Sequence, residues 1–172
     1  MENTLFHARY GRNDERSYFT MHSELISIAQ EIAAHHGLDP ALICAIIAQE
    51  SAWNPHAIRY EPAFFTKYVA PLFTNNKVAP PTNTEAHSRA ISWGLMQVMG
   101  QSAREMGFAG QYLSELCDPA VGIEVGCTLF AYKLRIAAGN ISQALRFWNG
   151  GANPNYSAEV ESRMASYLSE PS

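Results

Sequence analysis

Apolar residues recur at helical spacing along most of the chain. After Ser23, Leu25 and Ile32 belong to an i, i+3, i+4 pattern, and Gly37 ends the helix that this pattern predicts. The same spacing predicts further helices over residues 95–106, 119–138, 142–148 and 156–168. No alternating valine- and isoleucine-rich segment competes with them, so the sequence predicts an all-α fold.

The most apolar of the predicted helices begins after Asp39, a typical N-cap residue, with Pro40 in its first turn, and it runs to about Ser51. It is apolar almost all round, which is typical of a central, buried helix. Glu50 follows Ile43 at i+7 and therefore shares the face of the buried isoleucines.

The position of Glu50 has two interpretations. A carboxyl group turned toward apolar side chains near the negative end of a helix dipole has a raised pKa, as a general acid at neutral pH requires. Alternatively, Glu50 lies at the solvent-exposed end of its helix. Periodicity alone leaves both open.

Length and composition predict a single domain. The chain has 172 residues, of which 47% are hydrophobic and 16% charged, enough to bury one core and too apolar for disorder. We expect an extended N-terminal arm over residues 1–20 and a domain over 21–172. Within it, residues 56–92 form an irregular insertion, which holds short helices over 61–73 and a breaker-rich loop over 79–88.

Charge, cysteine and histidine content exclude several classes of function. A net charge of −4 gives no global attraction to nucleic acid. The three cysteines are an odd number, which favours reduced thiols over a Cys117–Cys127 disulfide. The histidines lack metal-ligand spacing, so we expect no metal site and no cofactor.

Targeting signals are not evident either. The first twenty residues lack the apolar core of a signal peptide, and no later segment is long enough to span a bilayer. We therefore expect no stable membrane insertion. The protein is either made in the cytoplasm and released by another route, or a leader has been removed.

Several short blocks follow one another along the chain: Glu50-Ser51, Gly94-Leu95-Met96-Gln97, Leu116-x-Asp118-Pro119-x-x-Gly122-Ile123-x-x-Gly126, Trp148-Asn149-Gly150-Gly151 and Tyr156. Taken in this order, they resemble the signature of the soluble lytic transglycosylases (the SLT family) and their goose-type lysozyme relatives. The resemblance reaches from the first predicted helix to the last. It implies an all-α, lysozyme-like single domain with a central buried helix.

The resemblance also implies a function. Glu50 would be the general acid and then the general base that cleaves the MurNAc–GlcNAc β-1,4 bond of peptidoglycan and leaves 1,6-anhydro-MurNAc ends. The expected partner is the glycan strand, bound by a monomer that acts on the cell wall in the periplasm or outside the cell. A phage endolysin, or a wall-remodelling enzyme of a secretion or tail apparatus, fits this description.

Further site residues follow from the same blocks. Ser51 belongs to the Glu-Ser pair, and Gln97 carries an amide that could bind an N-acetyl group or a sugar hydroxyl. Gln97 could equally be an ordinary helix-surface residue. Met99 is implied to line the glycan groove, although a methionine at this spacing is commonly core filler.

The last two blocks contribute an aromatic pair and an amide. Trp148 stands where the family has a tyrosine next to Asn149, so an aromatic face for stacking is kept and a hydroxyl group is lost. If the family resemblance is set aside, this turn is interpreted as an ordinary helix C-cap. Tyr156 is implied to hydrogen-bond Glu50, the alternative being a half-buried aromatic in a first helical turn.

The insertion over 56–92 departs from the family pattern, which has a short connection there. It contains Glu61 next to Arg59, and hydrolytic glycosidases use two carboxylates where a transglycosylase needs one. Glu61 could be that second carboxylate, which would make the enzyme a lysozyme. Alternatively, it forms a structural ion pair with Arg59. A non-catalytic wall-binding module on the same fold is a further alternative.

Overall fold

A computed structural model describes residues 13–74 and 82–168 of the chain. Most of this part is helical, in agreement with the predicted fold class. Its longer helices are α2 (Asn13–His35), α3 (Pro40–Ser51), α8 (Pro119–Ile136), α9 (Ile141–Trp148) and α10 (Tyr156–Met164). Among the described residues, no helix has both the length and the apolar character needed to cross a membrane.

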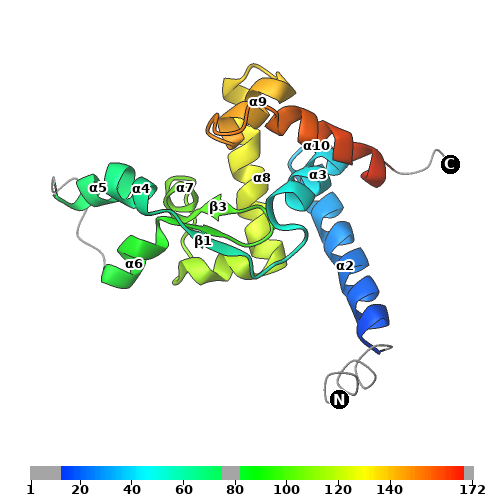
Figure 1. The fold of residues 1–172 in the computed structure, drawn as a ribbon, viewed down its shortest axis with the longest axis horizontal. Helices are drawn as coiled ribbons and strands as arrows, with labels where there is room; N and C mark the ends of the chain where they lie inside the picture. Colours follow the sequence, from blue (N-terminus) through cyan, green and yellow to red (C-terminus); the bar gives the residue numbers. More distant parts are fainter. Residues whose placement is uncertain (1–12, 75–81, 169–172) are drawn as a thin grey trace, which may run out of the picture.

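Helix α3 is the centre of the core, as its composition predicts. The side chain of Asp39 accepts hydrogen bonds from the backbone N–H groups of Ala41 and Leu42, and Pro40 occupies the first turn. Every residue from Ala41 to Ile47 is buried. Helices α2 and α10 pack directly on α3, while α8 packs on α2 and α9 (Figure 1).

The three cysteines are separate thiols, as predicted. Cys44 and Cys127 are fully buried, and burial raises the pKa of each thiol to about 12. Both therefore stay protonated and fill space in the core.

A small antiparallel sheet, which the sequence did not predict, lies between the helical core and the rest of the insertion. Its order is β1 (Ile58–Tyr60), β2 (Ile91–Trp93) and β3 (Val98–Met99), with Arg59 opposite Ser92 and Ser92 opposite Met99. These strands are too short for an alternating pattern to be visible.

Beyond the sheet, the insertion forms a helical lobe at one end of the molecule (Figure 1). The lobe contains α4 (Pro62–Phe64), the π-helix η1 (Phe65–Val69), α5 (Ala70–Thr74) and α6 (Asn83–Ser88). The prediction of a loop over 79–88 is wrong for residues 83–88, which form α6, while residues 79–81 lie outside the described part. Thr82 accepts a hydrogen bond from the N–H of Glu85, the first half of a capping box, which is a helix-start signal.

Two other boundaries differ from the prediction. Helix α2 begins at Asn13, so the extended arm expected over 1–20 is wrong for residues 13–20, while residues 1–12 lie outside the described part. A polar helix end carries no apolar stripe that would reveal it. The helix predicted over 95–106 is confined to α7 (Gly100–Glu105), because Gly94 and Gln97 both have positive φ and form a turn before β3.

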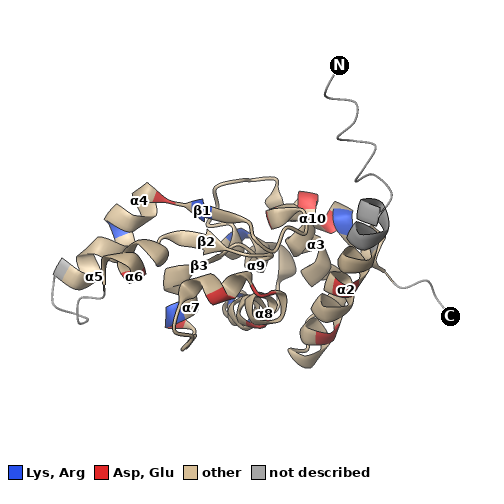
Figure 2. Ribbon diagram, turned by 90° about the horizontal axis from the view of Figure 1, so that it is seen from below, with Lys and Arg blue, Asp and Glu red and all other residues tan. Residues whose placement is uncertain are grey.

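The remaining elements connect these parts. The 3-10 helix η2 (Leu113–Cys117) leads into α8, whose N-cap Asp118 accepts a hydrogen bond from the N–H of Val121, and η3 (Ala165–Tyr167) follows α10. In the described part of the chain, acidic and basic residues are scattered over the elements (Figure 2).

Candidate functional site

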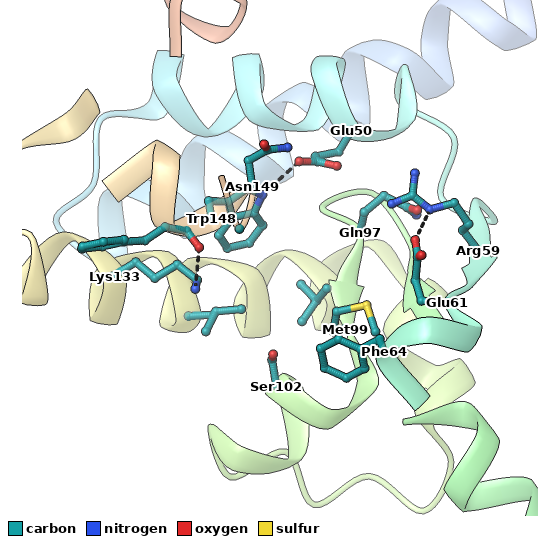
Figure 3. A pocket seen from close by; sticks show the side chains of 14 residues that line it. Glu50, Arg59, Glu61, Phe64, Gln97, Met99, Ser102, Lys133, Trp148 and Asn149 are labelled. Carbon is teal, nitrogen blue, oxygen red and sulfur yellow. Dashed lines mark hydrogen bonds and ion pairs between the residues drawn. The ribbon is translucent and has the colours of Figure 1, made fainter. Parts of the chain in front are cut away.

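Glu50 lies in the last turn of α3, where the core meets a pocket (Figure 3). Ile43, Ile46 and Ile47 on the same helix are fully buried, and Glu50 itself is half-buried and lines the pocket, so it is turned inward rather than out to solvent. Directly after the helix, Ala52 and Trp53 have φ values of 49° and 64°. Left-handed backbone is unfavourable for residues with a Cβ atom, and here it turns the chain sharply toward β1.

Two side chains from distant elements donate hydrogen bonds to the same oxygen of Glu50. The hydroxyl of Tyr156, the first residue of α10, lies 2.5 Å from Oε1, and the indole N–H of Trp148, the last residue of α9, lies 3.0 Å from it. Neither bond uses Oε2. The expected contact between Tyr156 and Glu50 is therefore present in the structure, together with a tryptophan contact that the sequence did not predict.

Opposing effects act on the pKa of Glu50. Burial raises it above the ordinary value, whereas the hydrogen bonds from Tyr156 and Trp148 and the positive charge of Arg59 lower it, and the net shift is upward. Burial and the neighbouring Glu50 carboxylate also raise the pKa of the Tyr156 phenol, so this group keeps its proton and acts as a donor. The site thus favours the protonated acid while retaining partners for the ionised form.

The pocket has a volume of about 360 Å³, which suits a sugar-sized ligand. It lies between α3, the sheet, α7, α8 and the α9–α10 connection (Figure 3). Its walls combine charged, aromatic and aliphatic side chains. The lining residues are Glu50, Arg59, Glu61, Phe64, Gln97, Val98, Met99, Ser102, Leu129, Lys133, Phe147, Trp148, Asn149 and Gly150.

Gln97 lines the pocket, but its amide is already engaged. Its Nε2 donates to the carbonyl oxygens of Ala57 and Gly94, both at 2.9 Å, and its Oε1 accepts from the hydroxyl of Ser92 at 3.0 Å. Both amide hydrogens are therefore used, and the main effect of Gln97 is to fix the turn between β2 and β3.

The other residues implied by the family resemblance occupy different positions. Met99 and Asn149 line the pocket, and the Asn149 Oδ1 accepts a hydrogen bond from the N–H of Asn153 at 2.6 Å. Ser51 is not among the lining residues, and its hydroxyl donates to the carbonyl of Ile47 at 3.2 Å. Met96 is fully buried.

Glu61 forms an ion pair at the edge of the pocket. The Nε of Arg59 lies 2.5 Å from the Oε1 of Glu61, and the side chain of Arg59 is 72% exposed against 34% for Glu61. Arg59 is the middle residue of β1 and Glu61 directly follows the strand, and both line the pocket with Glu50. A carboxylate that accepts a hydrogen bond from a guanidinium forms a charge-assisted contact, as the structural alternative for Glu61 predicts.

The sequence did not reveal several pocket residues, notably Lys133, Phe147 and Ser102. For Lys133 a signal existed, because it follows Leu129 at i+4 on an otherwise apolar part of α8. The same spacing argument places Glu50 on the face of the buried isoleucines. In the ranges 13–74 and 82–168, no three His, Cys, Asp or Glu side chains come together as a metal site.

A polar network lies behind Glu50 and holds α10 against α3. The amide of Gln49 donates to Glu159 at 2.8 Å, Asn153 donates to the same carboxylate oxygen at 3.0 Å, and Arg163 donates to Gln49 at 2.7 Å. These contacts fix the two helices that carry Glu50 and Tyr156.

Comparison with known proteins identifies the family of the chain. The model of the transglycosylase SLT domain matches residues 27–167, a span that contains every residue of the pocket. No solved structure matches the chain significantly. The SLT family acts on the cell wall and degrades peptidoglycan. Because the match covers most of the chain, the protein belongs to the SLT transglycosylase family and is a peptidoglycan-degrading enzyme.

Proposed function

We propose that the protein is a lytic transglycosylase that cleaves the MurNAc–GlcNAc β-1,4 bond and leaves 1,6-anhydro-MurNAc ends, with Glu50 acting first as an acid and then as a base. The observation that carries this proposal is the environment of Glu50. Burial favours its protonated form, and two fixed donors on one oxygen stabilise its ionised form. A group that must both give and take a proton in one turnover needs both influences.

In the first step, Glu50 donates its proton to the glycosidic oxygen, and the bond from that oxygen to C1 of MurNAc breaks. The GlcNAc residue leaves with a free 4-hydroxyl group. The carbonyl oxygen of the MurNAc acetamido group stabilises the positive charge at C1. Glu50, now ionised, keeps the hydrogen bonds from Tyr156 and Trp148.

In the second step, the Glu50 carboxylate takes the proton from the C6 hydroxyl of the same MurNAc residue. The C6 oxygen then attacks C1 and closes the 1,6-anhydro ring. Glu50 is protonated again, and no water is consumed. One carboxylate is sufficient for this sequence, which fits a pocket whose second carboxylate, Glu61, is already paired with Arg59.

The test is the digestion of purified sacculi followed by treatment of the soluble fragments with borohydride. Anhydro ends have no reducing group and remain unchanged, whereas the ends left by a hydrolase are reduced. We expect fragments that borohydride does not alter. Fragments with reducible MurNAc ends would refute the proposal.

A hydrolytic lysozyme is the alternative, because Glu61 lines the same pocket as Glu50. Glu61→Gln separates the two functions. A transglycosylase should lose less than about tenfold in turnover, since only the ion pair with Arg59 is disturbed, whereas a catalytic carboxylate contributes about a hundredfold to ten-thousandfold. Rates on sacculi measure this loss, and Glu31→Gln on the exposed face of α2 is the matched control. A collapse of activity in Glu61→Gln alone would favour the lysozyme.

Tyr156→Phe tests how Glu50 is tuned. The substitution removes the 2.5 Å hydrogen bond, and that bond lowers the pKa of Glu50, so the pKa should rise further. We expect turnover to fall about tenfold to a hundredfold, the usual effect of losing a hydrogen bond to a charged group. The high-pH limb of the pH–rate profile should move to higher pH, because Glu50 stays protonated longer.

Tyr132→Phe, at an exposed position of α8, is the matched control and should change neither quantity. A Tyr156→Phe enzyme with lower turnover and an unmoved pH profile would mean that the hydroxyl does not act through Glu50.

A further inference from the structure

Lys133 belongs to the wall of the pocket that also carries Trp148. It lies on α8, one turn after Leu129, and both side chains line the pocket. Its Nζ donates a hydrogen bond to the carbonyl oxygen of Phe147 at 3.0 Å, and Phe147 directly precedes Trp148. In the view of Figure 3, Lys133 and the Arg59–Glu61 pair lie on opposite sides of the pocket, with Glu50 and Trp148 between them.

The ammonium group of Lys133 has no carboxylate partner in the described part of the chain. The ion pairs found there are His36–Glu124, Arg59–Glu61, Arg89–Glu85 and Arg104–Glu85. The group is nevertheless half-buried, and this burial lowers the pKa of Lys133 below its ordinary value. Removing a cation from water is unfavourable unless an opposite charge compensates for it.

A purely structural role would use Lys133 as a cap for the carbonyl groups at the end of α9. That role occupies one of the three ammonium donors. Lys133 lines the pocket, so a ligand that enters the pocket can reach its remaining donors. Capping therefore explains the bond to Phe147 but leaves unexplained why the charge lies inside the pocket.

We propose that Lys133 forms an anion subsite that binds a carboxylate carried by a muramic acid residue of the glycan strand. The inference rests on the proposed function, because the glycan must enter the pocket beneath Glu50. Two sources offer this chemistry: the lactyl carboxylate itself in strands without peptides, and the carboxylates of the peptide stem in strands that carry them. The subsite would orient the strand relative to Glu50 in a protein whose net charge of −4 does not attract anions.

The test measures binding in a Glu50→Gln background, which prevents turnover. Lys133→Met, Lys133→Gln and Lys133→Arg are compared on three ligands: naked glycan strands, peptide-bearing strands and neutral N-acetylglucosamine oligomers. Lys133→Gln retains a donor for the Phe147 carbonyl, and Lys133→Arg retains the charge. Lys67→Met, at an exposed position of η1 outside the pocket, is the matched control for the loss of one positive charge.

We expect Lys133→Met and Lys133→Gln to weaken the binding of anionic strands about tenfold to a hundredfold, while binding of the neutral oligomer stays unchanged and Lys133→Arg restores most of the affinity. A loss confined to naked strands identifies the lactyl carboxylate, and a loss on peptide-bearing strands identifies the stem. Equal losses on neutral and anionic ligands, or no loss at all, would overturn the subsite.

Turnover of sacculi by the protein with Glu50 intact is measured separately. If turnover fails while the Lys133 substitutions weaken the binding of anionic strands and leave that of neutral oligomers unchanged, the proposed function falls and the subsite stands. If turnover succeeds and the substitutions weaken neither ligand, or both equally, the reverse holds.

Discussion

Glu50→Gln should lower the turnover of peptidoglycan about a hundredfold to ten-thousandfold, the range that a general acid contributes. The amide has nearly the same shape as the carboxyl group and can still accept the hydrogen bonds from Tyr156 and Trp148 through its oxygen. It has no proton to deliver to the glycosidic oxygen. Initial rates of solubilisation of purified sacculi measure the loss.

Stability provides a second readout for the same variant. Because burial raises the pKa of Glu50 in the folded state, folding is most favoured where Glu50 is protonated, and stability falls as the pH rises through the folded-state pKa. The amide does not ionise and removes this loss. At neutral pH, the melting temperature of Glu50→Gln should therefore equal or exceed that of the parent.

Glu24→Gln, at an exposed position of α2, is the matched control for Glu50→Gln and should alter neither activity nor stability. Near wild-type turnover by Glu50→Gln would contradict the assignment of Glu50. If neither the parent nor Glu50→Gln degraded sacculi and both bound them, the protein would be a wall-binding module instead.

Gly94→Ala should destabilise the fold by about 2 to 5 kcal/mol. A Cβ atom at Gly94 would lie 2.2 Å from the carbonyl oxygen of Leu116, a backbone atom that cannot move aside easily, and the φ of Gly94 is +65°. Both the left-handed backbone and the overlap contribute. For a domain of this size we expect the melting temperature to fall by about 5 to 15 °C, as measured by thermal unfolding.

Gly37→Ala separates the two contributions. Gly37 has a φ of +66°, almost the same as Gly94, yet a Cβ atom there would meet nothing within 4 Å. This variant should lose only the backbone contribution, about 1 kcal/mol. Equal losses in Gly94→Ala and Gly37→Ala would mean that the close approach to Leu116 has no energetic effect.

The structure gives a physical reason for the glycines in the family-like blocks. Gly94 and Gly122 approach the same carbonyl oxygen of Leu116, at 2.2 Å and 2.3 Å from their built Cβ positions. Similarly, a Cβ atom added at Gly126 would lie 2.3 Å from the sulfur of Met96. The block that begins at Gly94 and the block that contains Leu116, Gly122 and Gly126 therefore pack directly against each other, although they are separate in sequence. This contact holds the turn that carries Gln97 against α8.

Local signals made the helical core predictable from the sequence. Asp39-Pro40 and Asp118-Pro119 each place an N-cap next to a first-turn proline, and the helices begin there. The spacing of Glu50 to the buried isoleucines allowed its inward position, and the resemblance of the surrounding blocks to the family favoured it over the exposed alternative. These features depend on residues within a few turns of one another, so sequence patterns record them directly.

Long-range contacts account for what the sequence did not reveal. The sheet pairs β1 with β2 across the whole insertion, and neither strand is long enough to show a period. Trp148 reaches Glu50 from a position 98 residues away. Lys133 enters the pocket only because α8 packs beside α9. Such juxtapositions arise from tertiary packing, which single-sequence patterns do not encode.

Digestion of sacculi in water enriched in oxygen-18, followed by mass analysis of the fragments, tests most directly whether the enzyme closes an anhydro ring instead of adding water. If the C6 hydroxyl of MurNAc is the nucleophile, every new end is an anhydro sugar that is lighter by one water than a reducing end and carries no oxygen-18. New ends that have gained one heavy oxygen from the solvent would contradict this mechanism and would identify the enzyme as a hydrolase.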